Sequence, residues 1–377
     1  MKFARMLTGG VDWVLVSAVV VLSCIGLVTM YSYVGDNIYF ERQAIWIPLG
    51  IVVMMAATLP DYRFLRTGSA GLWFYIACIG LLALVLIIGD IALGAQSRIN
   101  LGIFSLQPSD PAKLALIIVL AKYFSKRHIE IAHFKHIFVS GLYALLILAF
   151  VFIEPDFGSS IIIFCIWFGM VLVSGISLRH LALVAILGAV TFGLLWSVAL
   201  KDYQKERIST FLNPVADRQG AGYNAFQSMI AVGSGQLFGK GVGFGTQSKL
   251  QFLPEYETDF IFAAYAEEWG IVGIVVLFAL FGIVIWRILY HALKSPVNFE
   301  RLFCAGVSIL IISHFFVHVG MNIGLLPVTG TTIPFLSYGG SHLVTELLGI
   351  GMVMGMRAGR GASQNPALGY NPAERFL

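Results

Sequence analysis

Charged residues are scarce in this chain. Only 12% of its 377 residues are Asp, Glu, Lys or Arg, whereas 58% are hydrophobic. A soluble protein of this length needs far more charge to cover its surface, so the composition excludes the soluble globular classes. The apolar residues gather in runs near the length that a helix needs to cross a bilayer, which indicates a polytopic membrane protein.

Cysteine is rare as well, and its placement excludes disulfide and metal frameworks. All four cysteines lie inside apolar runs without a partner at disulfide or metal spacing, so we interpret them as small hydrophobic residues. The N-terminal stretch MKFARMLTGGVDW has no cleavable signal before the first apolar run, which we therefore expect to be retained as a helix. We find no internal repeat and no soluble domain, and expect residues 1–377 to form a single transmembrane domain.

The apolar runs predict an all-α protein with about ten transmembrane helices. One long extracytoplasmic loop, residues 201–258, separates the seventh span from the eighth, and within it Asn224–Val232 is expected to form a short amphipathic helix on the membrane. Residues 358–377 are expected to be a cytoplasmic tail. The predicted spans are Trp13–Tyr33, Ala44–Leu59, Leu72–Ile88, Ala112–Phe124, Ile137–Ile153, Ser160–Val173, Leu181–Leu200, Phe260–Trp286, Leu302–Leu326 and Leu343–Met356.

The distribution of charge predicts the orientation. With ten spans and both termini in the cytoplasm, the short outer segments carry only three cations, Arg42, Arg98 and Lys113. Most of the other Lys and Arg residues fall in inner segments, as the positive-inside rule requires. The acidic residues show the opposite bias, so we expect the functional site to face outward.

Three carboxylates crowd the stretch LPEYETDFIF, where the eighth span begins. Asp259 has two interpretations. It is an N-cap that accepts hydrogen bonds from the first free amides of the helix, or it is a catalytic base at the membrane surface. A stripe of small residues on its helix face lets another helix approach closely and favours the second interpretation; this stripe comprises Ala263, Ala266, Gly270 and Gly273.

Several polar residues lie inside predicted spans. Glu267 and Glu268 follow Asp259 on the same helix, where an ionised acid must be paired, protonated or in a wet cavity. We expect structural hydrogen bonds to neighbouring helices, with a functional role as the alternative. His314 and His318 share one face of the ninth span, and because a metal site needs more ligands, we expect them to pack.

The stretch LQPSDPAKLA joins an acid and a base at the start of the fourth span. Asp110 followed by Pro111 is typical of an N-cap with proline at the first helical position. Lys113 then falls in the first turn, where the helix dipole disfavours a cation, so something must compensate its charge. Asp110 can pair with it. Two interpretations stay open: a structural ion pair, or a pair placed beside an anionic substrate.

The stretch PVTGTTIPFLSYGGSH lies between the last two spans and is too apolar for a free loop. We expect a re-entrant or packed segment. Gly339, Gly340 and Ser341 end it at the start of a helix, where free amides form an anion site or, equally, where a glycine turn is needed. Arg42 and Arg98 are further candidates for binding a phosphate.

These stretches together resemble the SEDS family (shape, elongation, division and sporulation). The resemblance spans nearly the whole chain in order, and its glycine-rich GKGVGFGTQS stretch is more similar to the elongation branch than to the division branch. The matching stretches are QPSDPAK at 107–113, RISTFLNPVADRQGAGYNAFQSMIAVGSG at 207–235, GKGVGFGTQS at 239–248, FLPEYETDFIFAAYAEEWG at 252–270 and PFLSYGGS at 334–341.

The resemblance implies a ten-helix peptidoglycan glycosyltransferase. Such an enzyme polymerises lipid II into β-1,4-linked glycan strands at the outer face of the bacterial plasma membrane, with a class B penicillin-binding protein and the elongation machinery as partners and no nucleic acid. The family's catalytic aspartate in TDFIF corresponds to Asp259, and its acid–lysine pair to Asp110 and Lys113. This chain departs from the family at the pair, because aspartate replaces the usual glutamate and Pro111 follows it.

The rival function is a lipid II flippase or another membrane transporter, which would use buried acids such as Glu267, Glu268 and Glu346. A non-catalytic scaffold for wall synthesis is a third possibility. Most polar residues cluster at the outer rim, which favours the transferase. Because a diphosphate is already a good leaving group, cations or a divalent metal can replace a general acid, although we recognise no metal-ligand set in the sequence.

Overall fold

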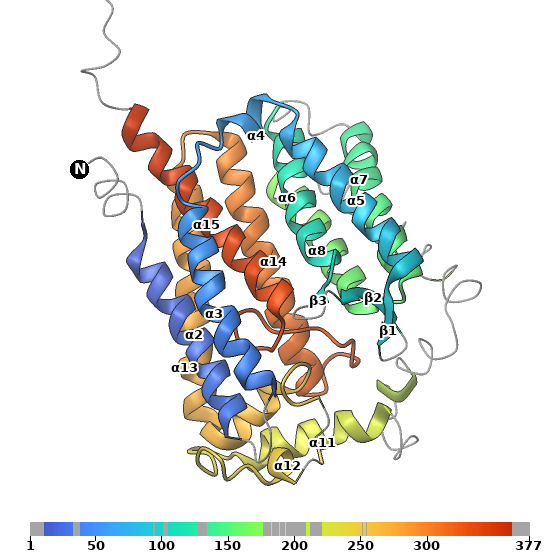
Figure 1. Cartoon of the computed structure of the whole chain (residues 1–377), viewed down its shortest axis with the longest axis vertical. Coiled ribbons are helices and arrows are strands. Elements are labelled where there is room, and N and C mark those ends of the chain that lie inside the picture. Colours follow the sequence, from blue (N-terminus) through green and yellow to red (C-terminus); the bar gives the residue numbers. More distant parts are fainter. Residues whose placement is uncertain are drawn as a thin grey trace, which may run out of the picture.

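The protein is an elongated helical bundle (Figure 1). The computed structural model describes residues 11–32, 38–92, 95–100, 105–126, 134–175, 209–211, 221–250, 252–253 and 255–363, with 182, 188 and 193 as isolated positions. Helices α2 and α13 lie side by side, α2 begins and α15 ends at the same end of the bundle, and α11 and α12 lie at the other end, which we call the outer end. The long helices that the sequence predicts therefore run roughly along the vertical axis of Figure 1.

The helices of the described residues follow the apolar runs of the sequence. Their bounds are α2 Trp13–Tyr31, α3 Ile38–Ala56, α4 Arg63–Thr67, α5 Ala70–Ile88, α6 Ser109–Ser125, α7 Phe134–Ile153, α8 Phe157–Val173, α11 Ala221–Ser234, α12 Thr246–Lys249, α13 Ile261–Lys294, α14 Asn298–Asn322 and α15 Gly340–Ser363. Helix α14 is the most central of them, and it packs against α6, α8 and α13. The amphipathic helix predicted at Asn224–Val232 is present as the longer α11.

Six of the described helices, α2, α3, α5, α7, α13 and α14, are long and apolar enough to cross a membrane. The chain is therefore a multi-pass membrane protein. Each predicted span within the described residues coincides with a helix, although α13 runs past Trp286 to Lys294. Most of the predicted span Leu181–Leu200 lies outside the described residues, as do parts of the 201–258 loop and of the 358–377 tail. The total of ten spans therefore stays a prediction.

A small antiparallel sheet between α5 and α6 was not predicted. It consists of β1 Asp90–Ala92, β2 Ala95–Asn100 and β3 Ser105–Leu106, with β2 in the middle. The pairing sets Asp90 opposite Arg98 and Ile99 opposite Leu106. The strands are too short to show a clear alternating pattern, so the all-α prediction holds for the bundle and misses this connection.

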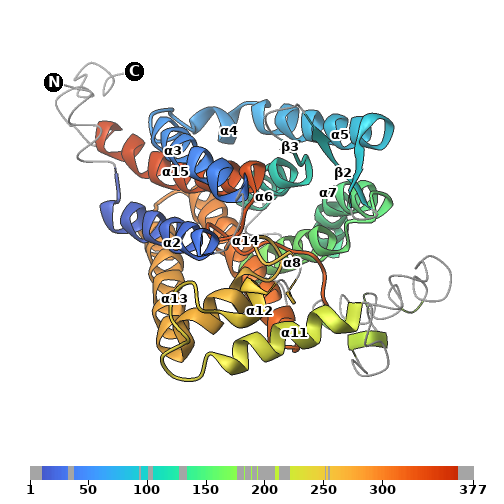
Figure 2. The same cartoon turned by 60° about the horizontal axis from the view of Figure 1, so that its bottom comes forward.

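Helix α13 is not straight, contrary to the single span that the sequence predicts. Gly270 has φ 62° and ψ −163°, a conformation open to glycine, and it divides the helix into two halves that run in different directions (Figure 2). The Glu267 and Glu268 carbonyls of the first half accept from the amides of Lys240 and Gly241, both at 3.0 Å. The amides that start the second half are also satisfied, because Ile271 donates to Gln236 O (2.9 Å) and Val272 to Leu237 O (3.1 Å).

The glycine-rich loop after α11 therefore caps both halves of the broken helix. A broken helix is tolerated in a membrane protein only where other groups satisfy its freed backbone, and the loop does this with four hydrogen bonds. A Cβ at Gly235 or Gly239 would collide with the backbone at Ala266 or Glu268. Gly270 of the small-residue stripe thus packs against this loop, whereas Ala263 packs with Ala231 of α11.

Candidate active site at the outer end

Asp259 lies in a turn immediately before α13 and is half-buried. The helix N-cap is Phe260, without a side-chain cap, so the prediction that Asp259 caps the helix is wrong. The turn is instead formed locally, since the Asp259 amide donates to Glu255 O at 3.0 Å. The Asp259 carboxylate faces Gly330, where a Cβ would stand 3.4 Å from Oδ2. A side chain at position 330 would therefore crowd this carboxylate.

Asn322, the last residue of α14, holds the start of α13 in place. Its side-chain amide donates to Asp259 O (3.0 Å) and to His318 O (2.8 Å). Its carbonyl oxygen accepts from Ala263 N (3.3 Å) and from the Ser228 hydroxyl (3.2 Å). Because Asn322 is completely buried and uses both ends of its amide, it fixes the backbone that carries Asp259.

The connection between α14 and α15, residues 323–339, packs into the outer end as the sequence predicts. The Ser337 hydroxyl donates to Thr258 O (2.7 Å), and the Tyr338 amide donates to Glu257 O (2.9 Å). The chain immediately before Asp259 is therefore tied to this connection. Burial raises the pKa of the Glu257 carboxyl, so its negative charge is disfavoured next to Asp259.

His314 and His318 support the same connection from α14. The Nδ1 atom of His314 lies 3.2 Å from Thr332 O, and that of His318 lies 2.7 Å from Thr331 O. Both rings are buried and both face backbone carbonyls, so the prediction that they pack is confirmed. Within the described part of the chain, no group of three or more His, Cys, Asp or Glu side chains could hold a metal ion.

The Asp110–Lys113 pair exists and is buried at the start of α6. Lys113 Nζ donates to Asp110 Oδ1 at 3.2 Å, and the two side chains are 3% and 4% exposed. Helix α6 begins at Ser109 with Pro108 as its N-cap residue, so the prediction of an Asp110 N-cap followed by Pro111 is displaced by two positions. Asp110 Oδ2 has no hydrogen-bond partner. Unsatisfied buried atoms of this kind are typical of a site that meets a ligand or water.

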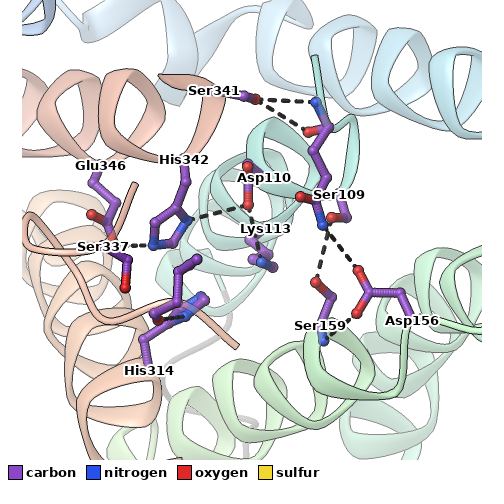
Figure 3. Close-up of polar contacts among 12 residues, drawn as sticks. Ser109, Asp110, Lys113, Asp156, Ser159, His314, Ser337, Ser341, His342 and Glu346 are labelled. Carbon is purple, nitrogen blue, oxygen red and sulfur yellow. Dashed lines mark hydrogen bonds and ion pairs between the residues drawn. The ribbon is translucent and has the colours of Figure 1, made fainter. Parts of the chain in front are cut away.

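His342 and Glu346, both on α15, extend the pair into a buried network (Figure 3). His342 Nδ1 lies 3.3 Å from Asp110 Oδ1, and His342 Nε2 lies 3.0 Å from Glu346 Oε1. Glu346 Oε2 accepts from the Phe335 amide at 3.2 Å, which links the network to the α14–α15 connection. This connection therefore contacts both the Asp259 turn and the Asp110–Lys113 pair.

A second set of polar contacts joins α6, α8 and α15 beside the network (Figure 3). Gln107 Nε2 donates to Asp156 Oδ2 (3.0 Å), while Asp156 Oδ1 caps α8 by accepting from Ser159 N (2.9 Å). The Gln107 amide donates to the Ser341 hydroxyl at 3.3 Å. Glu154, which precedes Asp156 in the sequence by two positions, is completely buried. Burial, together with the charge of Asp156, raises the pKa of Glu154 to about 8.

The predicted anion-binding residues are not all equally available. Gly339 N lies 3.5 Å from Gln43 Oε1, and the Ser341 hydroxyl is engaged with Gln107. A Cβ at Gly340 would collide with Trp46, which explains the glycine there by packing. The side chains of Arg42 and Arg98 are exposed. Lys113 is thus the buried cation among the candidates, and the others stay predictions.

Glu267 and Glu268 make structural hydrogen bonds, as the sequence favoured, with the glycine-rich loop and with the first turn of the short helix α12. Glu267 is completely buried and accepts from Lys240 Nζ (2.7 Å), Thr246 N (2.8 Å) and Gln247 N (3.2 Å). Glu268 Oε1 accepts from Gly243 N at 2.9 Å. These bonds hold the loop over the break in α13, and they remove two of the three acids that the transporter hypothesis invoked.

Sequence reasoning missed Asn322, His342 and Asp156. Asn322 and His342 are single polar residues at the ends of apolar helices, and their partners are 63 and 232 residues away, respectively. Asp156, which precedes a helix at a Pro-Asp-Phe-Gly stretch, carried a local N-cap signal that was available in the sequence.

The fold and this site define a class: multi-pass helical membrane proteins in which polar side chains from several helices converge at one end of the bundle. The chain matches the family model of cell cycle proteins FtsW, RodA and SpoVE over residues 5–360, and it belongs to this family. The resemblance found in the sequence motifs is thereby confirmed.

Relatives and solved structures agree with this membership. The peptidoglycan glycosyltransferase MrdB of Escherichia coli K12 is 38% identical over 333 residues, 88% of this chain and 89% of MrdB. Stage V sporulation protein E of Bacillus subtilis is 36% identical, covering 91% and 96%. A solved peptidoglycan synthase complex, described as coordinating polymerization and crosslinking, has a chain with TM-score 0.79 and 31% identity, covering 94% and 99%. The rod shape determining protein RodA of Thermus thermophilus has TM-score 0.70 and 29% identity, covering 92% and 96%.

Proposed function

We propose that this protein is a peptidoglycan glycosyltransferase that polymerises lipid II into β-1,4-linked glycan at the outer face of the bacterial plasma membrane, for cell elongation and shape. The observation that carries the proposal is the fixed Asp259 turn. Asn322 and Ser337 hold the backbone on both sides of Asp259, and its carboxylate faces Gly330. A catalytic group must be held in this way to react efficiently.

The chemistry needs one well-placed base. Lipid II carries its sugar on an α-linked undecaprenyl diphosphate, so a β-1,4 bond forms with inversion. A hydroxyl of the acceptor sugar attacks the anomeric carbon, its C–O bond to the diphosphate breaks, and the diphosphate leaves with the electron pair. Asp259 accepts the hydroxyl proton. No general acid is required, since the leaving group is already a stable anion.

The cations of the outer end are suited to the diphosphate. Lys113 is buried with one carboxylate oxygen as its described acceptor, so N–H donors remain for an anion. Arg42 and Arg98 are exposed and able to meet a lipid headgroup, and the Gly339–Ser341 amides at the start of α15 are a further candidate.

The remaining assignments follow from the family. The positive-inside pattern supports cytoplasmic termini. The structural similarity to a chain of a peptidoglycan synthase complex supports a class B penicillin-binding protein as partner. A divalent cation at the diphosphate would supply further charge stabilisation, and it stays a hypothesis.

The test is polymerisation by the purified protein in lipid nanodiscs, supplied with lipid II and scored for glycan chain length, with and without the partner transpeptidase. Asp259→Asn should fold normally and lose about 10²- to 10⁴-fold in rate, the usual contribution of a general base. Asp61→Asn is the matched control, because Asp61 is exposed and pairs only with Arg63 among the described contacts. Normal glycan synthesis by Asp259→Asn would overturn the proposal.

A further inference from the structure

His342 lies between two buried carboxylates (Figure 3). Its two ring nitrogens stand 3.3 Å from Asp110 Oδ1 and 3.0 Å from Glu346 Oε1. A neutral imidazole has one N–H and one lone-pair nitrogen, so it cannot donate to both oxygens. Because two carboxylates lie within 3.3 Å of one imidazole, the arrangement favours one extra proton. Either His342 is an imidazolium that faces both carboxylates, or one of the two carboxyls is protonated beside a neutral His342.

Both arrangements give the same total charge. With that proton, the network of Lys113, Asp110, His342 and Glu346 is neutral; without it, one negative charge is left over beside Lys113. The other titratable groups that face His342 do not change this balance. The His314 ring lies 4.7 Å away, centroid to centroid, and its Nδ1 faces a backbone carbonyl, as does that of His318.

The charge balance of the network affects Lys113 because a single oxygen of Asp110 contacts both Lys113 and His342. Lys113 and His342 both contact Asp110 Oδ1, whereas Oδ2 has no partner. The His342 contact takes part of the acceptor capacity that would otherwise hold Lys113. It also offsets the charge of Glu346, which would otherwise repel an anion approaching Lys113.

We propose that His342 is a positioning residue of the transferase site: its proton balances Glu346 and engages Asp110, so that the charge of Lys113 remains available to the diphosphate of the lipid substrate. The proposal rests on the proposed function for the identity of that anion. Its core, the charge balance of the network, depends only on the contacts above.

The test is a set of substitutions by glutamine assayed for lipid II polymerisation. His342→Gln removes the proton site and leaves one excess negative charge, so the apparent KM for lipid II should rise about tenfold, with a smaller change in kcat. His342→Gln combined with Glu346→Gln is neutral again and should recover most of that loss. Gln at position 346 still offers an oxygen to the Phe335 amide. His136→Gln is the control, since His136 is also buried but contacts Tyr123 near the other end of α6.

If His342 has only a structural role, the activity losses of the single and double variants are expected in the opposite order. If the ring only fills space or makes hydrogen bonds, the double variant loses at least as much as the single variant, and such a result overturns the proposal. Equal KM values for wild type and His342→Gln also overturn it.

Thermal unfolding separates this proposal from the proposed function. Charge balance predicts that His342→Gln unfolds at a lower temperature than the double variant, whether or not the protein polymerises lipid II. If this order holds and wild type makes no glycan, the proposed function fails while the charge balance stands. If wild type makes glycan and the order is reversed, the charge balance fails alone.

Discussion

Two buried clusters, an inner one at the start of α2 and an outer one at the start of α6, each join an aspartate, a histidine and a cation. In the inner cluster, Asp12 Oδ2 accepts from Arg287 at 2.7 and 2.9 Å and lies 2.6 Å from His291 Nε2. Asp12 Oδ1 accepts from Leu15 N at 3.2 Å, which caps α2. In the outer cluster, Asp110 uses one oxygen for both Lys113 and His342 and leaves the other without a partner.

The two clusters contain similar residue types, but they differ in whether their polar atoms have hydrogen-bond partners. The inner cluster uses both oxygens of its acid and joins α2 to α13, so its geometry is complete without a ligand. The outer cluster keeps an unused acceptor and unused ammonium donors in a buried position, which costs folding free energy unless something fills them. We infer that the inner cluster stabilises the fold and that the outer cluster serves the reaction.

The largest expected effect comes from replacing the outer pair by uncharged residues. Asp110→Asn with Lys113→Met should lower polymerisation about 100-fold or more, because the buried cation for the diphosphate is gone. Its unfolding temperature should stay equal to wild type or rise, since replacing a buried ion pair by uncharged groups is often neutral or stabilising. Circular dichroism melting and the lipid II assay measure the two effects. A large loss of stability with normal activity below the melting point would reverse the roles of the clusters.

The inner cluster should show the opposite pattern. Burial raises the pKa of Asp12, but the hydrogen bonds from His291 and Arg287 outweigh it and hold this pKa well below the ordinary value. A lowered pKa contributes stability that is present above the unfolded pKa of about 3.9 and is lost as the pH falls below it. Asp12→Asn should therefore cost about 2 kcal/mol at pH 7 and have a smaller stability loss on acidification to pH 3.

Polymerisation provides the second readout for Asp12→Asn. At temperatures well below its melting point, the variant should polymerise lipid II at the wild-type rate, because the cluster contacts the last turns of α13, whereas Asp259 precedes the start of this helix. A rate loss comparable to that of the outer pair would show that both clusters serve catalysis, and the comparison would fail.

The sequence predicts what local spacing controls. The helices follow apolar runs, and the Asp110–Lys113 contact follows from three-residue spacing on one helix turn. The role of His342 could not be predicted from the sequence, because its contact with Asp110 joins residues 232 positions apart. The break at Gly270 was missed for the same reason. The carbonyls of Gln236 and Leu237 and the amides of Lys240 and Gly241 make it tolerable, and they belong to a loop whose position no local pattern specifies.

The Asp259 prediction shows a second limit. Asp before an apolar run predicts an N-cap, yet the helix starts after Phe260 and Asn322 fixes the turn from another helix. Tertiary contacts, and not a local cap, therefore fix the position of the Asp259 backbone.

Lys240 and Glu267 give the smallest and most discriminating test, since they form a satisfied ion pair at the outer end. Glu267 is completely buried and also accepts from the amides of Thr246 and Gln247, so it keeps partners when Lys240 is lost. Lys240 is partly exposed, so Lys240→Met should cost only about 0.5–1 kcal/mol in thermal unfolding and leave the rate of lipid II polymerisation unchanged. Lys113→Met, the same substitution in the unsatisfied cluster, is the matched comparison and should lose activity. If Lys240→Met loses as much activity as Lys113→Met, the comparison fails. A cluster would then serve the reaction because it lies at the outer end, whether or not its polar atoms all have hydrogen-bond partners.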